Sequence, residues 1–276
     1  MQNLPHTETL AAHEKDGLLY YTFPAFDAVD FVRHGFSTRL GGVSEGVFSS
    51  MNLSFTRGDA EAAVRENFAR FCTAIGVDSA DVVISAQEHH VNIHNATAAD
   101  RGRGVTRERG YTDIDGLLTD EPCVVLCTQY ADCVPLFFVD PVRRVVGMSH
   151  AGWKGTVADI AAVTVERMCR DYGCRREDIL AAVGPSIGPC CFEVDAPVYE
   201  AFARLSVFDE SCVRRRGEKF DINLWETNRR MLMRAGVREE HITVTDLCTR
   251  CHPDVFWSHR ATGGIRGSLA GFISIV

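Results

Sequence analysis

Short runs of β-branched and aromatic residues recur along the whole 276-residue chain, and they constrain its fold more than any other feature. Gly, Pro or Asp bounds each run, which is the pattern that predicts β-strands. We predict strands over 17–23, 31–38, 82–85, 123–128, 136–139, 145–149, 179–183, 242–247 and 267–276. Extended structure should therefore form the framework of this molecule.

Amphipathic segments that predict helices lie between some of these strands. They run from Asp59 to Gly76, from Thr156 to Gly173 and from Asp221 to Gly236, and a shorter helix should follow Pro197. Because strands and helices are interspersed without strict alternation, we expect a mixed α/β (α+β) sheet protein rather than a doubly wound one. No repeat or linker is visible, and only 98–112 has the composition of an exposed loop, so we expect one compact domain over 1–276.

Composition excludes several classes of partner and location. The net charge is -8 and no Lys/Arg-rich run occurs, so neither a nucleic acid nor an anionic membrane is an expected partner. Residues 1–16 are polar and lack the apolar stretch of a signal peptide, and no apolar run approaches the roughly 20 residues of a membrane span. We therefore expect a cytoplasmic protein. Gly-x-Gly-x-x-Gly and P-loop motifs are also absent from the sequence, which excludes nucleotide binding by those two devices.

Three segments each offer one metal-competent side chain where a strand-like run meets a turn. They carry His89, Cys133 and His150. Two imidazoles and one thiolate are typical of a catalytic zinc site, which keeps its fourth position for water or substrate. The spacings are too long for a zinc knuckle, so tertiary folding must assemble the site. The same residues also permit a metal-free thiol hydrolase with Cys133 as nucleophile and His150 as base, and spacing alone does not separate the two hypotheses.

Two further residues are candidates on chemical grounds. Arg39, in Ser-Thr-Arg-Leu-Gly-Gly, combines a fork of donors with a flexible backbone, so it is either a phosphate or carboxylate clamp or a solvated loop arginine. Asp115 begins an apolar run after the Arg/Gly-rich loop, and it is either a catalytic carboxylate or a turn residue.

Four of the eleven cysteines form close pairs in the sequence. Cys248-Thr-Arg-Cys251-His252 matches the c-type haem attachment pattern, which we reject because no export signal precedes it. With no second pair to complete four zinc ligands, a tight turn is the expected role of this segment. A disulfide between the neighbouring Cys190 and Cys191 would be strained, so we expect one to pack and the other to be an exposed thiol.

A series of motifs along almost the whole chain carries a resemblance to a known family. The motifs are His34-Gly-Phe-Ser-Thr-Arg39, Asn52-Leu-Ser54, Gln87-x-His89, Asp115-Gly-Leu-Leu-Thr119, Ala131-Asp-Cys-Val-Pro135, His150-Ala-Gly-Trp-Lys-Gly155, Gly184-Pro-Ser-Ile-Gly-Pro-Cys-Cys-Phe-Glu-Val194, Cys248-Thr-x-Cys251 and Phe256-Trp-Ser-His-Arg260. Together they resemble the bacterial multicopper polyphenol oxidase or laccase-domain family, whose members are understood as zinc-dependent purine nucleoside phosphorylases with adenosine deaminase activity.

The resemblance implies a layered fold, with mixed sheets inside and helices packed outside. It also implies that His89, Cys133 and His150 bind Zn²⁺. The expected partners are small molecules, namely a purine nucleoside together with phosphate or water. Within that activity, Cys133 and Asp115 are the expected catalytic residues, and Arg39, Gln87 and Ser258 are expected to bind substrate.

The older oxidase label of the family, a copper-dependent polyphenol oxidase, is the remaining alternative. Multicopper clusters need several histidines beyond a blue-copper site, and this chain has ten histidines in all and no His-x-His pair. A laccase cluster is therefore not supported. Copper could still occupy the zinc ligands opportunistically, because divalent copper outcompetes zinc at most nitrogen and sulfur sites.

Overall fold

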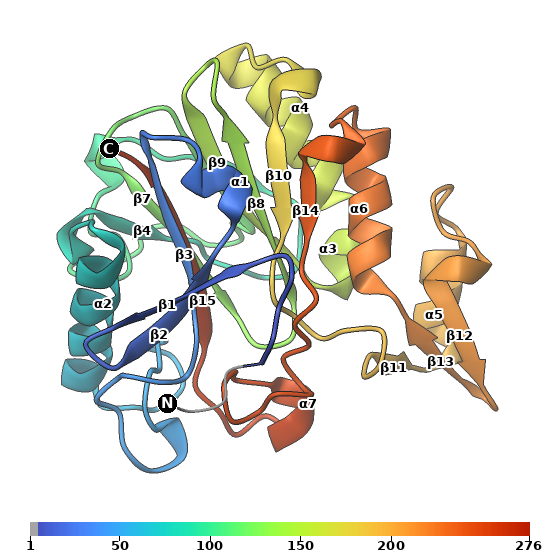
Figure 1. Cartoon of the computed structure of the whole chain (residues 1–276), viewed down its shortest axis with the longest axis horizontal. Helices are drawn as coiled ribbons and strands as arrows, with labels where there is room; N and C mark the ends of the chain where they lie inside the picture. Colours follow the sequence, from blue (N-terminus) through green and yellow to red (C-terminus); the bar gives the residue numbers. More distant parts are fainter. Residues whose placement is uncertain (1–4) are drawn as a thin grey trace.

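The strands of the computed structural model, which describes residues 5–276, form two large mixed sheets and a small one (Figure 1). The first sheet has the order β1 (Ala11–Lys15), β2 (Leu18–Thr22), β3 (Val32–Ser37), β15 (Leu269–Ile275), β7 (Val125–Tyr130), β4 (Val82–Ile84). The second has the order β14 (Ile242–Val244), β10 (Leu180–Val183), β8 (Val134–Asp140), β9 (Val145–Ala151), β6 (Gly116–Thr119), β5 (Ile93–Asn95). Strands β11 (Glu193–Val194), β13 (Lys219–Ile222) and β12 (Val213–Arg216) form the small sheet. Parallel pairs occur at the edges of both large sheets, which confirms the mixed architecture.

Helices cover the outer faces of the two large sheets. The helices are α1 (Pro24–Asp27), α2 (Glu61–Ile75), α3 (Trp153–Val157), α4 (Ile160–Tyr172), α5 (Ala196–Ala203), α6 (Leu224–Arg234) and α7 (His259–Thr262). Helix α2 shares an apolar cluster with the first sheet, and α4 and α6 share another with the second sheet. Figure 1 shows α2 on one side of the molecule and α4 and α6 on the other. The layered fold that the resemblance implied is confirmed.

A third apolar cluster lies between the two large sheets and joins them. Phe36 on β3 and Ile273 on β15 belong to it, together with Phe137 and Met148 from β8 and β9. Gly271 on β15 permits this close contact, because a Cβ at this glycine would lie 2.5 Å from Met148 Cε and 2.7 Å from Phe137 Cζ. The two sheets therefore share one core. A single domain over 1–276 stays a prediction, and residues 1–4 of that range lie outside the described part.

Two helix starts differ from the sequence prediction. The segment that we expected to begin at Thr156 is divided, because Asp159 has a left-handed backbone (φ 64°) between α3 and α4 and accepts the Ala162 N–H. Asp221 does not begin a helix but lies in β13, and Asn223 caps α6 by accepting the Glu226 N–H at 3.0 Å. In both cases the helix begins after a residue whose side chain caps it, Asp159 for α4 and Asn223 for α6.

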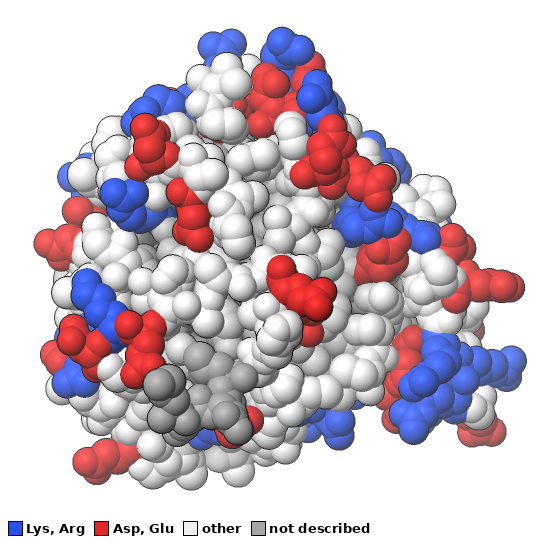
Figure 2. Space-filling view, in the orientation of Figure 1, with Lys and Arg blue, Asp and Glu red and all other residues white. Residues whose placement is uncertain are grey.

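The predicted strands are found, with boundaries shifted by a few residues, but several strands were missed. Strand β1 is polar and lies at an edge, β5 has only three residues, and β12 is mostly arginine. None of them therefore shows the run or alternation of apolar residues that predicts a strand. The small sheet instead depends on its contact with α5, where Tyr199 stacks on Phe220 with ring centroids 4.0 Å apart. In Figure 2, basic side chains gather over the β12–β13 hairpin, where Arg214 and Lys219 pair with acidic neighbours.

None of the helices within residues 5–276 combines the length and apolar character that crossing a bilayer requires. The cytoplasmic location stays a prediction from the sequence of 1–16.

We predict that Phe137→Ala will lower the free energy of unfolding by about 3–5 kcal/mol, because it opens a cavity between the two sheets. Chemical denaturation monitored by circular dichroism measures this change. Val142→Ala is the control, because Val142 is 68% exposed and its truncation should change stability by less than about 0.5 kcal/mol. An equal effect of the two substitutions would contradict the shared core.

Candidate metal centre

The structure brings His89, Cys133 and His150 together at one end of the joined sheets. His89 lies in the turn after β4, Cys133 in the turn between β7 and β8, and His150 near the end of β9. The three potential ligand atoms lie within 4.8 Å of one another, and His89 Nε2 is 4.0 Å from Cys133 Sγ. Tertiary folding thus assembles a three-donor set from residues that are far apart in the sequence.

Asp115, directly before β6, organises two of these three side chains. One of its carboxylate oxygens accepts hydrogen bonds from His150 Nδ1 at 2.8 Å and from the His89 N–H at 3.0 Å. The other accepts the N–H groups of Glu88 and His90 at 2.9 and 3.0 Å. Asp115 is fully buried, and burial raises the pKa of its carboxyl, but the bonds from His150 and the two backbone groups outweigh burial and lower it. Asp115 is therefore a carboxylate that fixes the orientation of the His150 ring.

The backbone at two of the turns adopts the left-handed region. His89 has φ 67° and Asp132, directly before Cys133, has φ 80°. Such conformations cost about 1–3 kcal/mol in non-glycine residues unless the surroundings enforce them. The hydrogen bonds from the backbone of 88–90 to Asp115 enforce the left-handed conformation of His89. Asp132 accepts hydrogen bonds from Thr249 Oγ1 and from the Arg260 N–H, both at 2.7 Å, and these enforce the second.

Gly152 leaves open the space that the three donors face. A Cβ at this position would lie 2.8 Å from His89 Cδ2, 3.2 Å from Cys133 Sγ and 3.5 Å from His150 Cε1. A larger residue would clash with His89 and crowd Cys133. The open space and the sulfur and nitrogen donors fit a zinc ion, for which cysteine and histidine are the common ligands.

The charges of the donors also fit a metal site. Burial raises the pKa of the Cys133 thiol, but the charge of His150 and the hydrogen bonds from His150 and His89 lower it to about 6. Burial in turn lowers the pKa of His150, and the Cys133 thiolate and Asp115 raise it to about 9. In the metal-free chain Cys133 is thus a thiolate next to the His150 imidazolium. A metal cation that displaces the imidazolium proton would bind a sulfur that is already deprotonated.

A polar pocket of about 180 Å³ opens above these donors. Its lining comprises Ser54, Thr56, Arg57, Ser85, Gln87, His89, Arg109, Gln129, Tyr130, Ala131, Cys133, His150, Arg266 and Ser268. Three of the lining residues are arginines, and no carboxylate belongs to the lining within residues 5–276. The pocket is therefore suited to an anionic group beside the metal centre.

Arg266 is the most informative of the three arginines. It is 8% exposed, and its Nη1 donates to the Gly267 carbonyl at 2.8 Å and to Ser268 Oγ at 3.1 Å. Its buried Nε has no hydrogen-bond partner. Burial, assisted by the nearby Arg57, lowers the pKa of Arg266 to about 10. A buried guanidinium with an unused donor is a suitable binding group for a phosphate or carboxylate.

The other predicted substrate residues differ in where the structure places them. Gln87 lines the pocket, held by hydrogen bonds to the Gln129 N–H and carbonyl at 2.8 and 2.7 Å. Arg39 is not among the lining residues. Its guanidinium donates to the Pro253 and Ser49 carbonyls and stacks on Trp257. Ser258 is buried and accepts the Ala261 N–H at the start of α7. No sequence pattern distinguishes Arg57 or Arg109 from the many other arginines of the chain.

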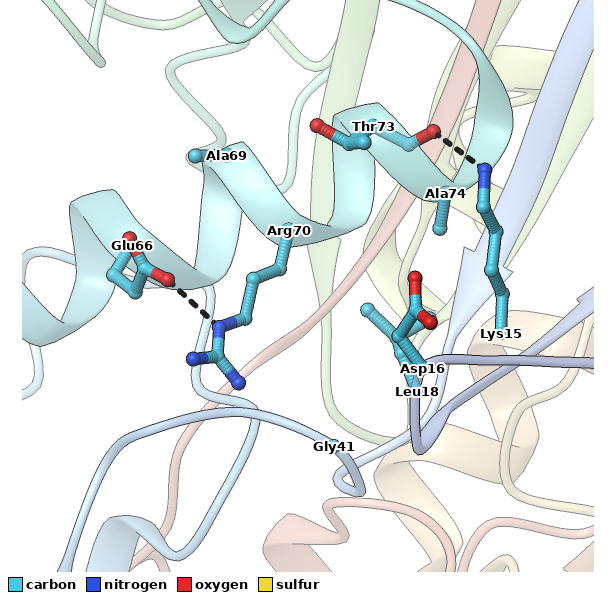
Figure 3. Close-up of a pocket in the computed structure, with 9 residues that line it drawn as sticks. All are labelled: Lys15, Asp16, Leu18, Gly41, Glu66, Ala69, Arg70, Thr73 and Ala74. Atoms are coloured by element: carbon cyan, nitrogen blue, oxygen red, sulfur yellow. Dashed lines mark hydrogen bonds and ion pairs between the residues drawn. The ribbon is translucent and has the colours of Figure 1, made fainter.

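A larger hollow of about 400 Å³ between α2 and the β1–β2 hairpin has no comparable chemistry (Figure 3). Three of its four charged side chains are already engaged, because Arg70 pairs with Glu66 and Lys15 donates to the Thr73 carbonyl. None of its lining residues in the described part of the chain is a histidine or cysteine, so we assign the functional site to the smaller pocket.

Comparison with known proteins identifies the family of this chain. Residues 33–276 match the family described as "Multi-copper polyphenol oxidoreductase laccase". "Purine nucleoside phosphorylase YlmD" of Bacillus subtilis is 37% identical over 243 residues, covering 87% of each protein. "Adenosine deaminase RL5", from an unknown prokaryotic organism, is 36% identical over 83% of this chain and 88% of its own length. The crystal structure of Bacillus licheniformis hypothetical protein YfiH has a TM-score of 0.91 at 34% identity and covers 98% of this chain and 100% of its own. The chain therefore belongs to the multi-copper polyphenol oxidoreductase laccase family.

Proposed function

We propose that the chain is a zinc-dependent purine nucleoside phosphorylase that also deaminates adenosine. The observation that carries the proposal is the three-donor set of His89, Cys133 and His150 at the floor of an arginine-lined pocket. The names of the relatives support both activities, since one is a purine nucleoside phosphorylase and another an adenosine deaminase.

The metal-binding residues would act as a preorganised unit. When bound, the zinc ion would supply a Lewis acid whose fourth coordination position is free for water or substrate. Asp115 keeps Nδ1 of His150 occupied, so the ring presents Nε2 toward the other donors. In this role Asp115 is a positioning residue, because it lies behind His150 and does not line the pocket.

The arginines of the pocket would bind the phosphate that attacks ribose C1′. In phosphorolysis the bond between C1′ and the purine nitrogen breaks as the bond to phosphate oxygen forms, and positive charge develops on the sugar. Arg266 can hold the attacking phosphate through its guanidinium, while Gln87 is placed to contact the nucleoside. In deamination, water takes the place of phosphate as the second reactant and attacks purine C6.

The proposal predicts two sets of products from one protein. Adenosine with phosphate should give adenine and ribose 1-phosphate, and adenosine without phosphate should give inosine and ammonia, as measured by chromatography. Loss of a residue that only supports a metal ligand typically lowers activity about 10- to 100-fold. Cys133→Ala removes a ligand itself, so it should reduce both rates by a larger factor. Cys123→Ala, at an exposed thiol outside the site, is the control. Absence of nucleoside products with zinc-loaded protein would refute the proposal.

The thiol-hydrolase and oxidase alternatives predict different results in the same preparation. If iodoacetamide inactivated the metal-free protein at Cys133 while chelators left activity intact, Cys133 would be a nucleophile rather than a ligand. If activity required copper and oxygen and acted on a polyphenol, the oxidase label would be correct.

A pair of substitutions distinguishes the two candidate phosphate clamps. Arg266→Ala should raise the KM for phosphate about 10- to 150-fold, the range for losing a charged hydrogen bond worth about 1.5–3 kcal/mol. Arg39→Ala should leave that KM nearly unchanged, because the Arg39 guanidinium is bound to backbone carbonyls. Zinc content and circular dichroism verify that both variants are folded. The reverse ranking of the two KM values would support the sequence prediction for Arg39.

Removing the charge of Asp115 should weaken the metal centre. We predict that Asp115→Asn will lower zinc affinity about 10- to 100-fold, because the amide cannot accept from both His150 and the backbone of 88–90. Competition with a chelator of known affinity measures the change. Asp113→Asn is the matched control, since Asp113 is two residues away and pairs only with exposed groups. Equal zinc affinity in the two variants would exclude the positioning role of Asp115.

A further inference from the structure

Four cysteines gather at a second place, outside the pocket. Cys190 and Cys191 lie in the loop between β10 and β11, and Cys248 and Cys251 lie in the loop after β14. All four Sγ atoms lie within 4.8 Å of one another, and Cys251 Sγ is 3.4 Å from both Cys190 Sγ and Cys191 Sγ. The expectation that Cys248-x-x-Cys251 has no second pair is therefore wrong. Cys190-Cys191 is that pair, and a tight turn, closed by the Cys191 N–H on the Gly188 carbonyl, brings it there.

We propose that Cys190, Cys191, Cys248 and Cys251 form a tetrathiolate zinc site that stabilises the fold. Zinc in structural sites has four tetrahedral ligands with Zn–S bonds of about 2.3 Å, which places the sulfurs about 3.8 Å apart. The observed 3.4 Å contacts and the 4.8 Å limit bracket this value. They are far longer than the about 2.05 Å of a disulfide bond, and all four thiols are free.

The surroundings of the four sulfurs are suited to thiolates. The Gly188 N–H donates to Cys248 Sγ at 3.2 Å, and Arg250 Nη1 donates to Cys191 Sγ at 3.4 Å. Four thiolates and one zinc ion carry net negative charge, which a backbone donor and a guanidinium both offset. Gly188 must be glycine for this approach, since a Cβ would lie 2.8 Å from Trp225 Cη2 and 3.2 Å from Cys248 Cβ.

The position of the four cysteines gives the site a structural role. A β-bridge between Ser186 and Cys248 joins the two loops that carry the cysteines. Both loops also donate hydrogen bonds to Asp132. The Ile187 N–H donates to the Asp132 carbonyl at 3.0 Å, and Thr249 Oγ1 donates to its carboxylate at 2.7 Å. Asp132 precedes Cys133 in the left-handed turn described above. A zinc ion that holds the two loops together would therefore also hold the turn that presents Cys133.

Elemental analysis of protein purified without added metal tests the proposal. The wild-type chain should contain about two zinc ions, one at each centre. The double variant Cys190→Ser/Cys251→Ser should lose about one of them, and Cys133→Ser should lose the other. Cys123→Ser, at an exposed thiol remote from both clusters, should lose none. Zinc content in the double variant equal to that of the wild type would overturn the proposal.

Two measurements keep the test decisive if the double variant does not fold. X-ray absorption at the zinc edge of the Cys133→Ser protein should show a shell of sulfur only, because the pocket site would then be empty. Alkylation and mass spectrometry of the wild type should find all four cysteines without a disulfide, and a Cys190–Cys251 or Cys191–Cys251 disulfide would refute the site. If Cys133→Ser retained all its zinc while the double variant lost it, the result would support the tetrathiolate site and refute the proposed zinc in the pocket.

Discussion

The geometry of the metal centre depends on one buried carboxylate, that of Asp115. Its two oxygens accept four hydrogen bonds, one from the His150 ring and three from the backbone of 88–90. A buried charge is costly unless donors compensate it, so this set of donors is fixed as a unit. It joins the turn after β4 to the end of β9 and sets the left-handed conformation of His89. Two of the three candidate metal ligands are thereby positioned by the same residue.

The third side chain depends on the contact between the two large sheets. Cys133 lies where the chain leaves β7 in the first sheet and enters β8 in the second. The antiparallel pairing of Pro135 with His150 sets how close the turn lies to β9, and Phe137 on β8 packs against the face of β15 at Gly271. Asp132 is held from the other side by Thr249 and Ile187. The proposed tetrathiolate zinc would thus act on the pocket through packing and hydrogen bonds, without contacting the substrate.

Much of the fold could be predicted from the sequence, because the central strands are apolar runs bounded by turn residues. Strands β1, β5 and β12 lack that pattern, and the arginines of β12 are exposed on a small outer sheet. The three candidate metal ligands could be proposed because each stands next to a strand end and has suitable chemistry. Arg39 and Arg266 could not be ranked, since only tertiary structure shows that Arg39 is bound by carbonyl groups while Arg266 faces the pocket. The four cysteines were missed for the same reason: their two pairs lie in different loops that only the fold brings together.

The proposed chemistry depends on zinc binding by His89, Cys133 and His150 at the floor of the pocket. Anomalous diffraction at the zinc edge, from crystals of protein purified without added metal, would locate the ion. We expect a peak about 2.0–2.3 Å from His89 Nε2, His150 Nε2 and Cys133 Sγ, with Asp115 still hydrogen-bonded to His150 Nδ1. No peak at that position in protein that is active on nucleosides would contradict it.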